Sequence, residues 1–148
     1  MNENEFYLEV SLALAGCQLV EQELKLYITE AFQLVHKCVG DRMPFKMCGE
    51  DYANSSLKRL IDGFKKLSNN EQLVKELYAF KNERNFLSHQ GITHCLDWNG
   101  DIFESTAAEF QERLGKIQVE ANRLQILIHK ETNKIGILCF TEFLDDAQ

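Results

Sequence analysis

Residues 4–39 contain a long run in which apolar side chains recur every three or four positions and no proline intervenes. The whole chain of 148 residues holds one proline and eight glycines, so few positions can interrupt a helix. The run predicts a helix of about 54 Å, with a kink near Gly16 or a frayed start and an end at Gly40 and Pro44. Its expected inner face is the following set: Tyr7, Val10, Leu14, Cys17, Leu24, Ile28, Ala31, Val35 and Cys38.

Three further segments repeat this helical spacing. They cover residues 55–67, about 69–90, and a stretch opening near Thr106 whose inner face is predicted as Phe110, Leu114, Ile117, Ala121, Leu124 and Ile128. Ser68 and Thr106 each stand three residues before a glutamate, the pattern of a capping box. Apart from an irregular segment at 40–53 the connections are short, which favours antiparallel neighbours. We therefore expect a mainly α protein, an antiparallel four-helix bundle in one domain over 1–148.

Two segments favour β structure instead. Asn99–Gly100 separates two β-prone runs, which predicts a small hairpin at about residues 92–103. The tail KIGILCFTEFL, residues 134–144, is also β-prone and would add a C-terminal strand to that hairpin.

Composition limits the partners and the compartment. The net charge of −7 argues against a positively charged coat for gripping long duplexes, although a small basic pocket remains compatible with it. No stretch reaches 18 consecutive apolar residues, so no membrane partner is expected. The acidic start MNENEFYLEV lacks the order of a signal peptide, and the five cysteines are an odd number without paired spacing. Both observations indicate a cytoplasmic protein with reduced, mostly buried thiols.

The third predicted helix places a charge where apolar side chains are expected. Leu73, Leu77, Phe80, Arg84 and Leu87 share one narrow face, with the guanidinium near its centre. A neighbouring lane of the same helix holds hydrogen-bonding side chains: Tyr78, Asn82, Asn85 and His89. Arginine within an apolar stripe is costly unless an anion pairs with it. A histidine close by suits proton transfer.

A structural explanation of the same residues stays open. Arg84 could lay its methylene groups on apolar neighbours and reach solvent, Glu21 or Glu23, while His89 simply occupies the helix end. Arg84 and His89 are five residues apart and diverge by about 140° in a straight helix. A catalytic interpretation therefore favours two copies of the chain related by a two-fold axis, with residues 82–91 of both at the contact and Phe86 exposed there.

The second predicted helix has a basic side opposite its apolar one. This basic strip consists of Lys58, Arg59, Lys65 and Lys66. It is either an ordinary solvated face or a surface that contacts RNA phosphates.

The motif Arg-x-x-x-x-His near a helix end, with asparagine directly after the arginine, resembles the HEPN superfamily (higher eukaryotes and prokaryotes nucleotide-binding). The stretches SSLKRLIDGFKKL and ELYAFKNERNFLSHQGI look like prokaryotic members of that group. The resemblance covers roughly residues 4–90 and 104–132, and it implies the family's four-helix bundle. At the position two residues after the histidine, where one subgroup carries a modified tyrosine, this chain has Gly91.

The resemblance implies a metal-independent endoribonuclease that acts as a homodimer, either a toxin with an antitoxin protein as partner or a phage-defence effector. His89 would act on the 2′-hydroxyl or the leaving oxygen. Arg84 would stabilise charge on the phosphate, and Asn85 would bind a phosphate oxygen or orient its neighbours. The expected product is a 2′,3′-cyclic phosphate, and no cofactor is expected.

Two other functions compete with this hypothesis. The first is a non-catalytic HEPN-like module that binds a nucleotide or a protein, which the acidic net charge favours. The second is a metal site built from His36, Cys38, Cys48, His94 and Cys95, whose spacings match no standard zinc arrangement. Buried thiols and a strand histidine explain that set better, so no metal is expected.

Overall fold

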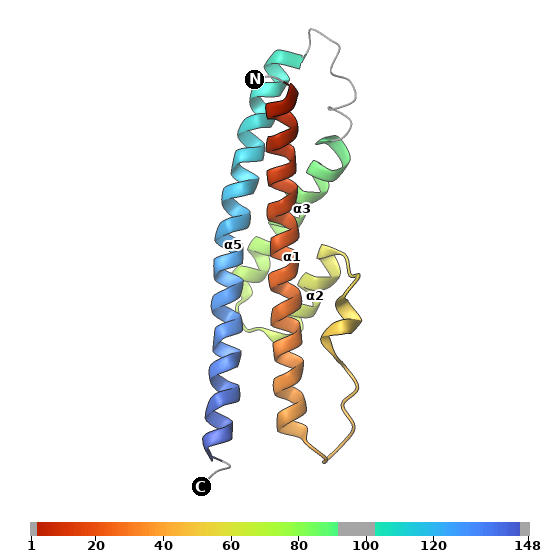
Figure 1. Cartoon of the computed structure of the whole chain (residues 1–148), viewed down its shortest axis with the longest axis vertical. Coiled ribbons are helices and arrows are strands. Elements are labelled where there is room, and N and C mark those ends of the chain that lie inside the picture. The colour runs from red at the N-terminus through yellow and green to blue at the C-terminus, as the bar shows by residue number, and fades with distance from the viewer. Residues whose placement is uncertain (1–2, 92–102, 146–148) are drawn as a thin grey trace.

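The computed structural model describes the backbone of residues 3–91 and 103–145 and the side chains of residues 4–90 and 108–140. This part of the chain is a helical bundle, as expected, and contains no strand. Its long elements are α1 (Glu3–Val39), α2 (Leu57–Leu67), α3 (Glu71–Phe86) and α5 (Phe103–Asp145) (Figure 1). Two short turns complete it: η1 (Gly49–Tyr52) is a 3-10 turn, and η2 (Leu87–Gly91) is a π turn.

The first helix runs without interruption, so the predicted kink near Gly16 is absent. Gly16 instead permits a close approach of α5, because a Cβ atom at this position would lie 3.0 Å from the Cβ of Ala121. The helix ends where expected: Gly40 has a φ of +53°, a conformation that costs glycine little and other residues more.

The directions of the helices correct the predicted antiparallel arrangement. Contacts between α1 and α5 advance together along both helices: Phe6 with Phe110, Glu9 with Gln118, and Glu23 with His129. These two helices are therefore parallel, as Figure 1 shows. Only α3 runs the other way, since Glu76 meets Arg123 whereas Glu83, further along α3, meets the earlier Arg113.

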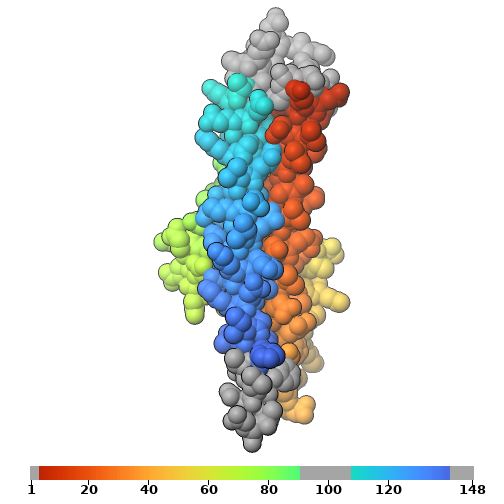
Figure 2. Space-filling model, turned by 60° about the vertical axis from the view of Figure 1, so that its left-hand side comes forward, coloured from red at the N-terminus to blue at the C-terminus, as the bar shows by residue number. Residues whose placement is uncertain are grey.

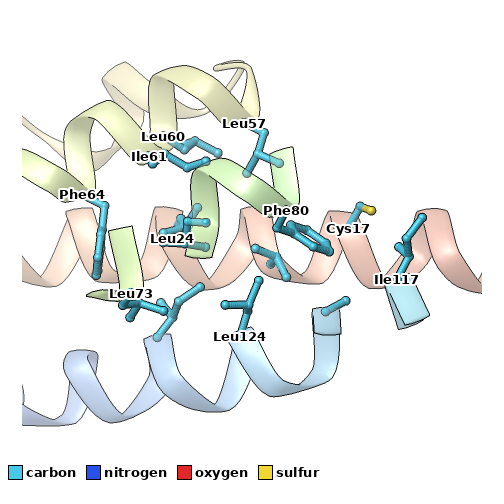
Figure 3. Close-up of a cluster of buried hydrophobic side chains, with 14 of the residues drawn as sticks. Cys17, Leu24, Leu57, Leu60, Ile61, Phe64, Leu73, Phe80, Ile117 and Leu124 are labelled. Atoms are coloured by element: carbon cyan, nitrogen blue, oxygen red, sulfur yellow. The ribbon is translucent and has the colours of Figure 1, made fainter. Parts of the chain in front are cut away.

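The connection between α1 and α2 causes this difference. Residues 40–56 fold back along α1, where Phe45 packs on Phe32 with ring centroids 5.9 Å apart and Tyr52 packs on Phe32 at 6.1 Å. The chain has thus already returned before α2 begins, and α2 runs in the same direction as α1 (Figure 3). A short connection would have forced α2 to run antiparallel to α1.

The core lies where α1 and α5 face α2 and α3 (Figure 3). The predicted apolar face of α3 is buried, with Leu73, Leu77, Phe80 and Leu87 at most 2% exposed. The predicted inner face of α5 is buried from Phe110 to Ile128 as well. Truncating an aromatic core residue such as Phe80 to alanine should cost about 3–5 kcal/mol. These contacts hold one face of α3 from Leu73 to Leu87, and the polar side chains lie on its other faces.

The two β predictions have different outcomes. The hairpin at 92–103 lies outside the described residues, except that Phe103 begins α5. The predicted C-terminal strand is wrong, because α5 continues through this segment to Asp145. Thr132 and Ile135 are buried and continue the inner face of the helix at steps of four and three residues after Ile128. Within the described residues, no helix has the length and apolarity that crossing a membrane requires.

Candidate functional site at the end of α3

The helix changes form where the arginine–histidine motif lies. From Leu87 to Gly91 the α-helical pattern of α3 gives way to the π turn η2, which contains His89. In a π turn the hydrogen bonds join residues five apart, so positions five apart approach the same side of the helix. Arg84 lies three residues before this turn, in the regular part of α3, so the turn changes the direction of His89 but not that of Arg84. Such turns are rare and often occur at functional sites.

Arg84 is held loosely. Its guanidinium nitrogen Nη2 lies 3.7 Å from Oε1 of Glu21 on α1, which is longer than a hydrogen bond. The Arg84 side chain is 37% exposed, and that of Glu21 is 17% exposed. Glu21 is its sole charged or hydrogen-bonding partner among the described residues, so most of its five N–H donors are unused there. Glu21 is one of the two acidic residues, with Glu23, that the structural explanation of Arg84 names as its partner.

A buried thiol adjoins this ion pair. Burial raises the pKa of Cys17 to about 11, and the positive charge of Arg84 offsets part of that increase. Cys17 is 2% exposed and remains a neutral thiol at physiological pH. Arg84 therefore stands at the edge of the core, with a neutral sulfur on one side and solvent on the other.

On the side of α3 that faces α5, Glu83 forms a close ion pair. Glu83 accepts two hydrogen bonds from Arg113 of α5, at 2.7 Å from Nε and 2.9 Å from Nη2. The guanidinium carbon of Arg113 also lies 3.3 Å from the centre of the Phe86 ring. These hydrogen bonds lower the pKa of Glu83 and raise that of Arg113. Phe86 is half-buried against Phe110 and Arg113, so the prediction that it is exposed is wrong.

The other two predicted catalytic side chains are accessible. Asn85 and His89 are both exposed, and Asn85 makes no side-chain hydrogen bond to any described residue. Tyr78, at the start of the polar lane, donates a hydrogen bond from its hydroxyl to Asp62 of α2, which raises the pKa of Tyr78 to about 12. This bond joins α3 to α2, whereas the later residues of the lane, Asn82, Asn85 and His89, are exposed.

The four residues of the basic strip on α2 have unequal surroundings. Lys58 pairs with Asp62 at 3.1 Å, and Arg59 donates to Ser55 and stacks on Tyr52. Lys65 and Lys66 are exposed and form no ion pair with any described residue. Because Asp62 meets Tyr78 across antiparallel helices, Lys58 lies nearer the level of the motif than Lys65 does. The strip therefore divides into two residues with hydrogen-bonded partners and two without them among the described residues, although the charge of Lys65 helps to lower the pKa of Asp62.

The side of α3 that faces α5 is unsuited to RNA. An open groove of about 1040 Å³ lies there, with an apolar floor that includes Phe80 and Ile117. Its lining contains two basic side chains, Arg113 and Lys116, and five glutamates: Glu76, Glu83, Glu109, Glu112 and Glu120. An anionic ligand would be repelled from this groove and would reach the motif from its outer side.

The described residues of the alternative metal site do not form a cluster. His36 lies 3.1 Å from the carbonyl oxygen of Met47 and packs on Phe45. Cys38 and Cys48 are exposed, whereas His94 and Cys95 lie outside the described residues. In the part of the chain that is described, no three metal-binding side chains cluster. Of the four cysteines described, only Cys17 is buried, so the expectation of mostly buried thiols is wrong for them.

Sequence reasoning missed the contacts of Arg113 and the π turn. Arg113 and Glu83 are 30 residues apart, so no local spacing could have paired them. Glu21, by contrast, was identifiable as an acidic residue on the first helix. The sequence matches no protein-family model, and searches of curated proteins and of solved structures gave no significant match.

Proposed function

We propose that the end of α3 binds and cleaves RNA without a metal ion, as the resemblance to HEPN endoribonucleases implies. The observation that carries the proposal is the loose, half-exposed setting of Arg84 beside exposed Asn85 and a histidine in a π turn. A charge whose function was purely structural would be expected to have short, directional partners, as Arg113 does.

Arg84 is the phosphate-binding group in this proposal. Its position at the core edge reduces the local dielectric constant, which strengthens its attraction to an anion. The planar guanidinium can donate two parallel hydrogen bonds to phosphate oxygens while Glu21 remains on its other side. Because Glu21 lies 3.7 Å away and forms no hydrogen bond, the guanidinium can turn towards a phosphate.

His89 moves the proton, and Asn85 orients the substrate. His89 accepts the proton of the RNA 2′-hydroxyl, the 2′-oxygen bonds to phosphorus, and the bond from phosphorus to the 5′-oxygen breaks. The leaving 5′-oxygen takes up a proton from water, and a 2′,3′-cyclic phosphate remains. Arg84 stabilises the charge that grows on the phosphate oxygens during this step. Asn85 donates a hydrogen bond to one of them.

The assembly and biological setting belong to the same proposal. Pairing of residues 82–91 from two chains would supply a composite site, but Phe86 is half-buried against Phe110 and Arg113 and therefore offers little apolar anchor for such a contact. We therefore assign a site to each chain of a homodimer. A role as a toxin or phage-defence effector, with an antitoxin protein as partner of the toxin, rests on the resemblance alone.

The test is cleavage of single-stranded RNA by the purified protein in EDTA. We expect products ending in 2′,3′-cyclic phosphate, identified by mass spectrometry, and their loss in both Arg84→Ala and His89→Ala. Helical content measured by circular dichroism should be unchanged in both variants. Normal cleavage by His89→Ala would refute the assignment of the catalytic base.

The ion pair with Glu21 favours a second candidate, a non-catalytic binding module in which Arg84 is structural. In that case the wild type would bind RNA or a nucleotide without cleaving RNA, and Arg84→Ala would lower the melting temperature. Cleavage by the wild type, with an Arg84→Ala variant that melts normally, excludes this candidate.

A further inference from the structure

Large apolar side chains that face solvent gather on α1 and α5. Four leucines of α1 are between 42% and 58% exposed: Leu8, Leu12, Leu19 and Leu26. On α5 five side chains are between 51% and 71% exposed, and four of them lie on one lane of the helix, with Leu138 outside it: Val119, Ile126, Ile137 and Phe140. Single exposed apolar residues are ordinary, whereas a contiguous set marks a contact surface.

These residues share one face of the molecule. Leu12, Leu19 and Leu26 each follow by three positions a residue that meets α5, namely Glu9, Gly16 and Glu23. Their lane therefore borders the contact between the two helices. The buried lanes of α1 and α5 both face α2 and α3, so the exposed lanes of these parallel helices lie together on the opposite side. Figure 2 shows α1 and α5 side by side along the molecule, with α2 and α3 at its edges.

The lanes themselves carry almost no formal charge, and the two glutamates of the seam between them, Glu9 and Glu23, contact Gln118 and His129 of α5. On α1 every third or fourth position from Leu8 to Leu26 is uncharged, with Ala15 and Gln22 between the leucines. On α5 the lane contains no acidic, lysine or arginine side chain over 25 residues: Gly115, Val119, Asn122, Ile126, His129, Asn133, Ile137 and Phe140. One residue in four of the whole chain is charged, at 26%, so this depletion is local.

We propose that this face, which we call the α1/α5 face, is the interface of a two-fold homodimer. Two chains that each carry a net charge of −7 repel one another, and only a surface without charge lets them approach closely. RNA would require basic side chains here, and a basic partner would require acidic ones. A neutral surface with leucine, isoleucine, asparagine and glutamine is complementary to itself across a dyad.

The size of the face fits this occupant. The lane of α5 rises about 38 Å from Gly115 to Phe140, that of α1 rises about 27 Å from Leu8 to Leu26, and each packed helix is about 10 Å wide. The two lanes thus cover roughly 650 Å² in projection, within the ~600–1,000 Å² per partner of a stable interface. Gly16 and Ala121 keep the two helices close, so the lanes form one platform rather than two ridges.

This assembly differs from the one that the sequence predicts through residues 82–91. Most of the α1/α5 face lies away from α3, although Gly115 and Val119 at its edge also line the groove between α3 and α5. The dimer therefore carries its two arginine–histidine motifs outside the contact. Each motif then reaches RNA independently. The inference does not depend on RNA cleavage, because assembly is measured without substrate.

The test is sedimentation equilibrium of the full chain at micromolar concentration. The wild type should sediment at twice the 17.1 kDa chain mass. The double variant Leu19→Lys/Ile126→Lys should be monomeric, with at least a hundredfold weaker association, because it buries four like charges in the interface. Both side chains are more than half exposed, so the chain should keep its helical circular dichroism. A second variant, Leu8→Lys/Leu12→Lys, should dissociate the dimer in the same way.

Two controls locate the contact. Met43→Lys changes an exposed apolar residue of the loop after α1 and should remain dimeric. Asn82→Lys adds a charge to the exposed side of α3 and should also remain dimeric. A monomeric wild type overturns the proposal. So does a dimer that persists in both α1/α5-face variants, whether or not Asn82→Lys dissociates it.

Discussion

Glu83 and Arg84 are neighbours on α3, and each forms an ion pair with a different helix. Glu83 receives two short hydrogen bonds from Arg113, whose guanidinium also stacks on Phe86. Arg84 reaches Glu21 at 3.7 Å by one nitrogen, and no hydrogen bond forms. The two arginines are similarly exposed, at 37% for Arg84 and 40% for Arg113. Exposure therefore does not distinguish them, and the geometry of their partners does.

The difference separates a structural charge from an available one. A bidentate arginine uses its directional donors inside the fold and has little to offer a ligand. A loosely paired arginine contributes little to stability, since exposed ion pairs are worth about 0–1 kcal/mol, and it retains donors for an anion. We therefore expect the α5 side of α3 to stabilise the fold, and we propose that the α1 side carries the RNA site.

The largest effect is expected for His89→Ala. Removing the proton-transfer group should slow RNA cleavage by about 10²–10⁴-fold. Because His89 is exposed, the free energy of unfolding should change by less than about 0.5 kcal/mol. The matched control is Gln90→Ala, an exposed neighbour that should cleave at the wild-type rate. Equal rates in both variants would show that the π turn presents no catalytic histidine.

A smaller effect is expected from the basic strip. Replacing Lys58, Arg59, Lys65 and Lys66 with glutamine should weaken RNA binding about tenfold and reduce its salt dependence. Lys65→Gln/Lys66→Gln should account for more of the change than Lys58→Gln, because Asp62 already neutralises Lys58. Fluorescence anisotropy at several salt concentrations measures both quantities. An unaltered salt slope would return the strip to an ordinary solvated surface.

The smallest expected effect is on the pH dependence of the free energy of unfolding, through the ion pair of Glu83 and Arg113. Arg113 lowers the pKa of Glu83 below its ordinary value of 4.5, so this carboxylate stabilises the fold above that pH. The contribution is lost as the pH falls through the lowered pKa. Glu83→Gln should therefore be less stable than the wild type by up to about 1 kcal/mol at pH 7, and the difference should shrink towards pH 3. Urea unfolding at both pH values measures it, and a constant difference would contradict this account.

Helical periodicity predicted most of the fold because burial decides it. The inner faces of α3 and α5 were identifiable from spacing alone, since each buries apolar side chains at every third or fourth position. The same spacing continues through Thr132 and Ile135, and this signal should have outweighed the β propensity of the tail. Strand propensity is a weak guide when a segment can extend a buried helical stripe.

The remaining errors arose from contacts between distant residues. The direction of α2 depends on Phe45 and Tyr52 packing on Phe32, which no local pattern reveals. The environment of Phe86 depends on Arg113, which belongs to another helix. At the site, spacing identified the polar lane, and Glu21 was named only in the structural alternative, as one of two acidic residues that Arg84 could reach. Spacing could not predict the π turn, because a straight helix is the starting assumption of any periodicity argument.

The most direct test compares Arg84→Ala with Arg113→Ala in the same two assays. Arg84→Ala should slow RNA cleavage at least a hundredfold and change the free energy of unfolding by less than about 0.5 kcal/mol. Arg113→Ala should cleave RNA at nearly the wild-type rate and lose about 1 kcal/mol of stability, through its ion pair and its contact with Phe86. The reverse result, in which Arg84→Ala unfolds the protein and Arg113→Ala abolishes cleavage, would contradict the assignment of fold and function to opposite sides of α3.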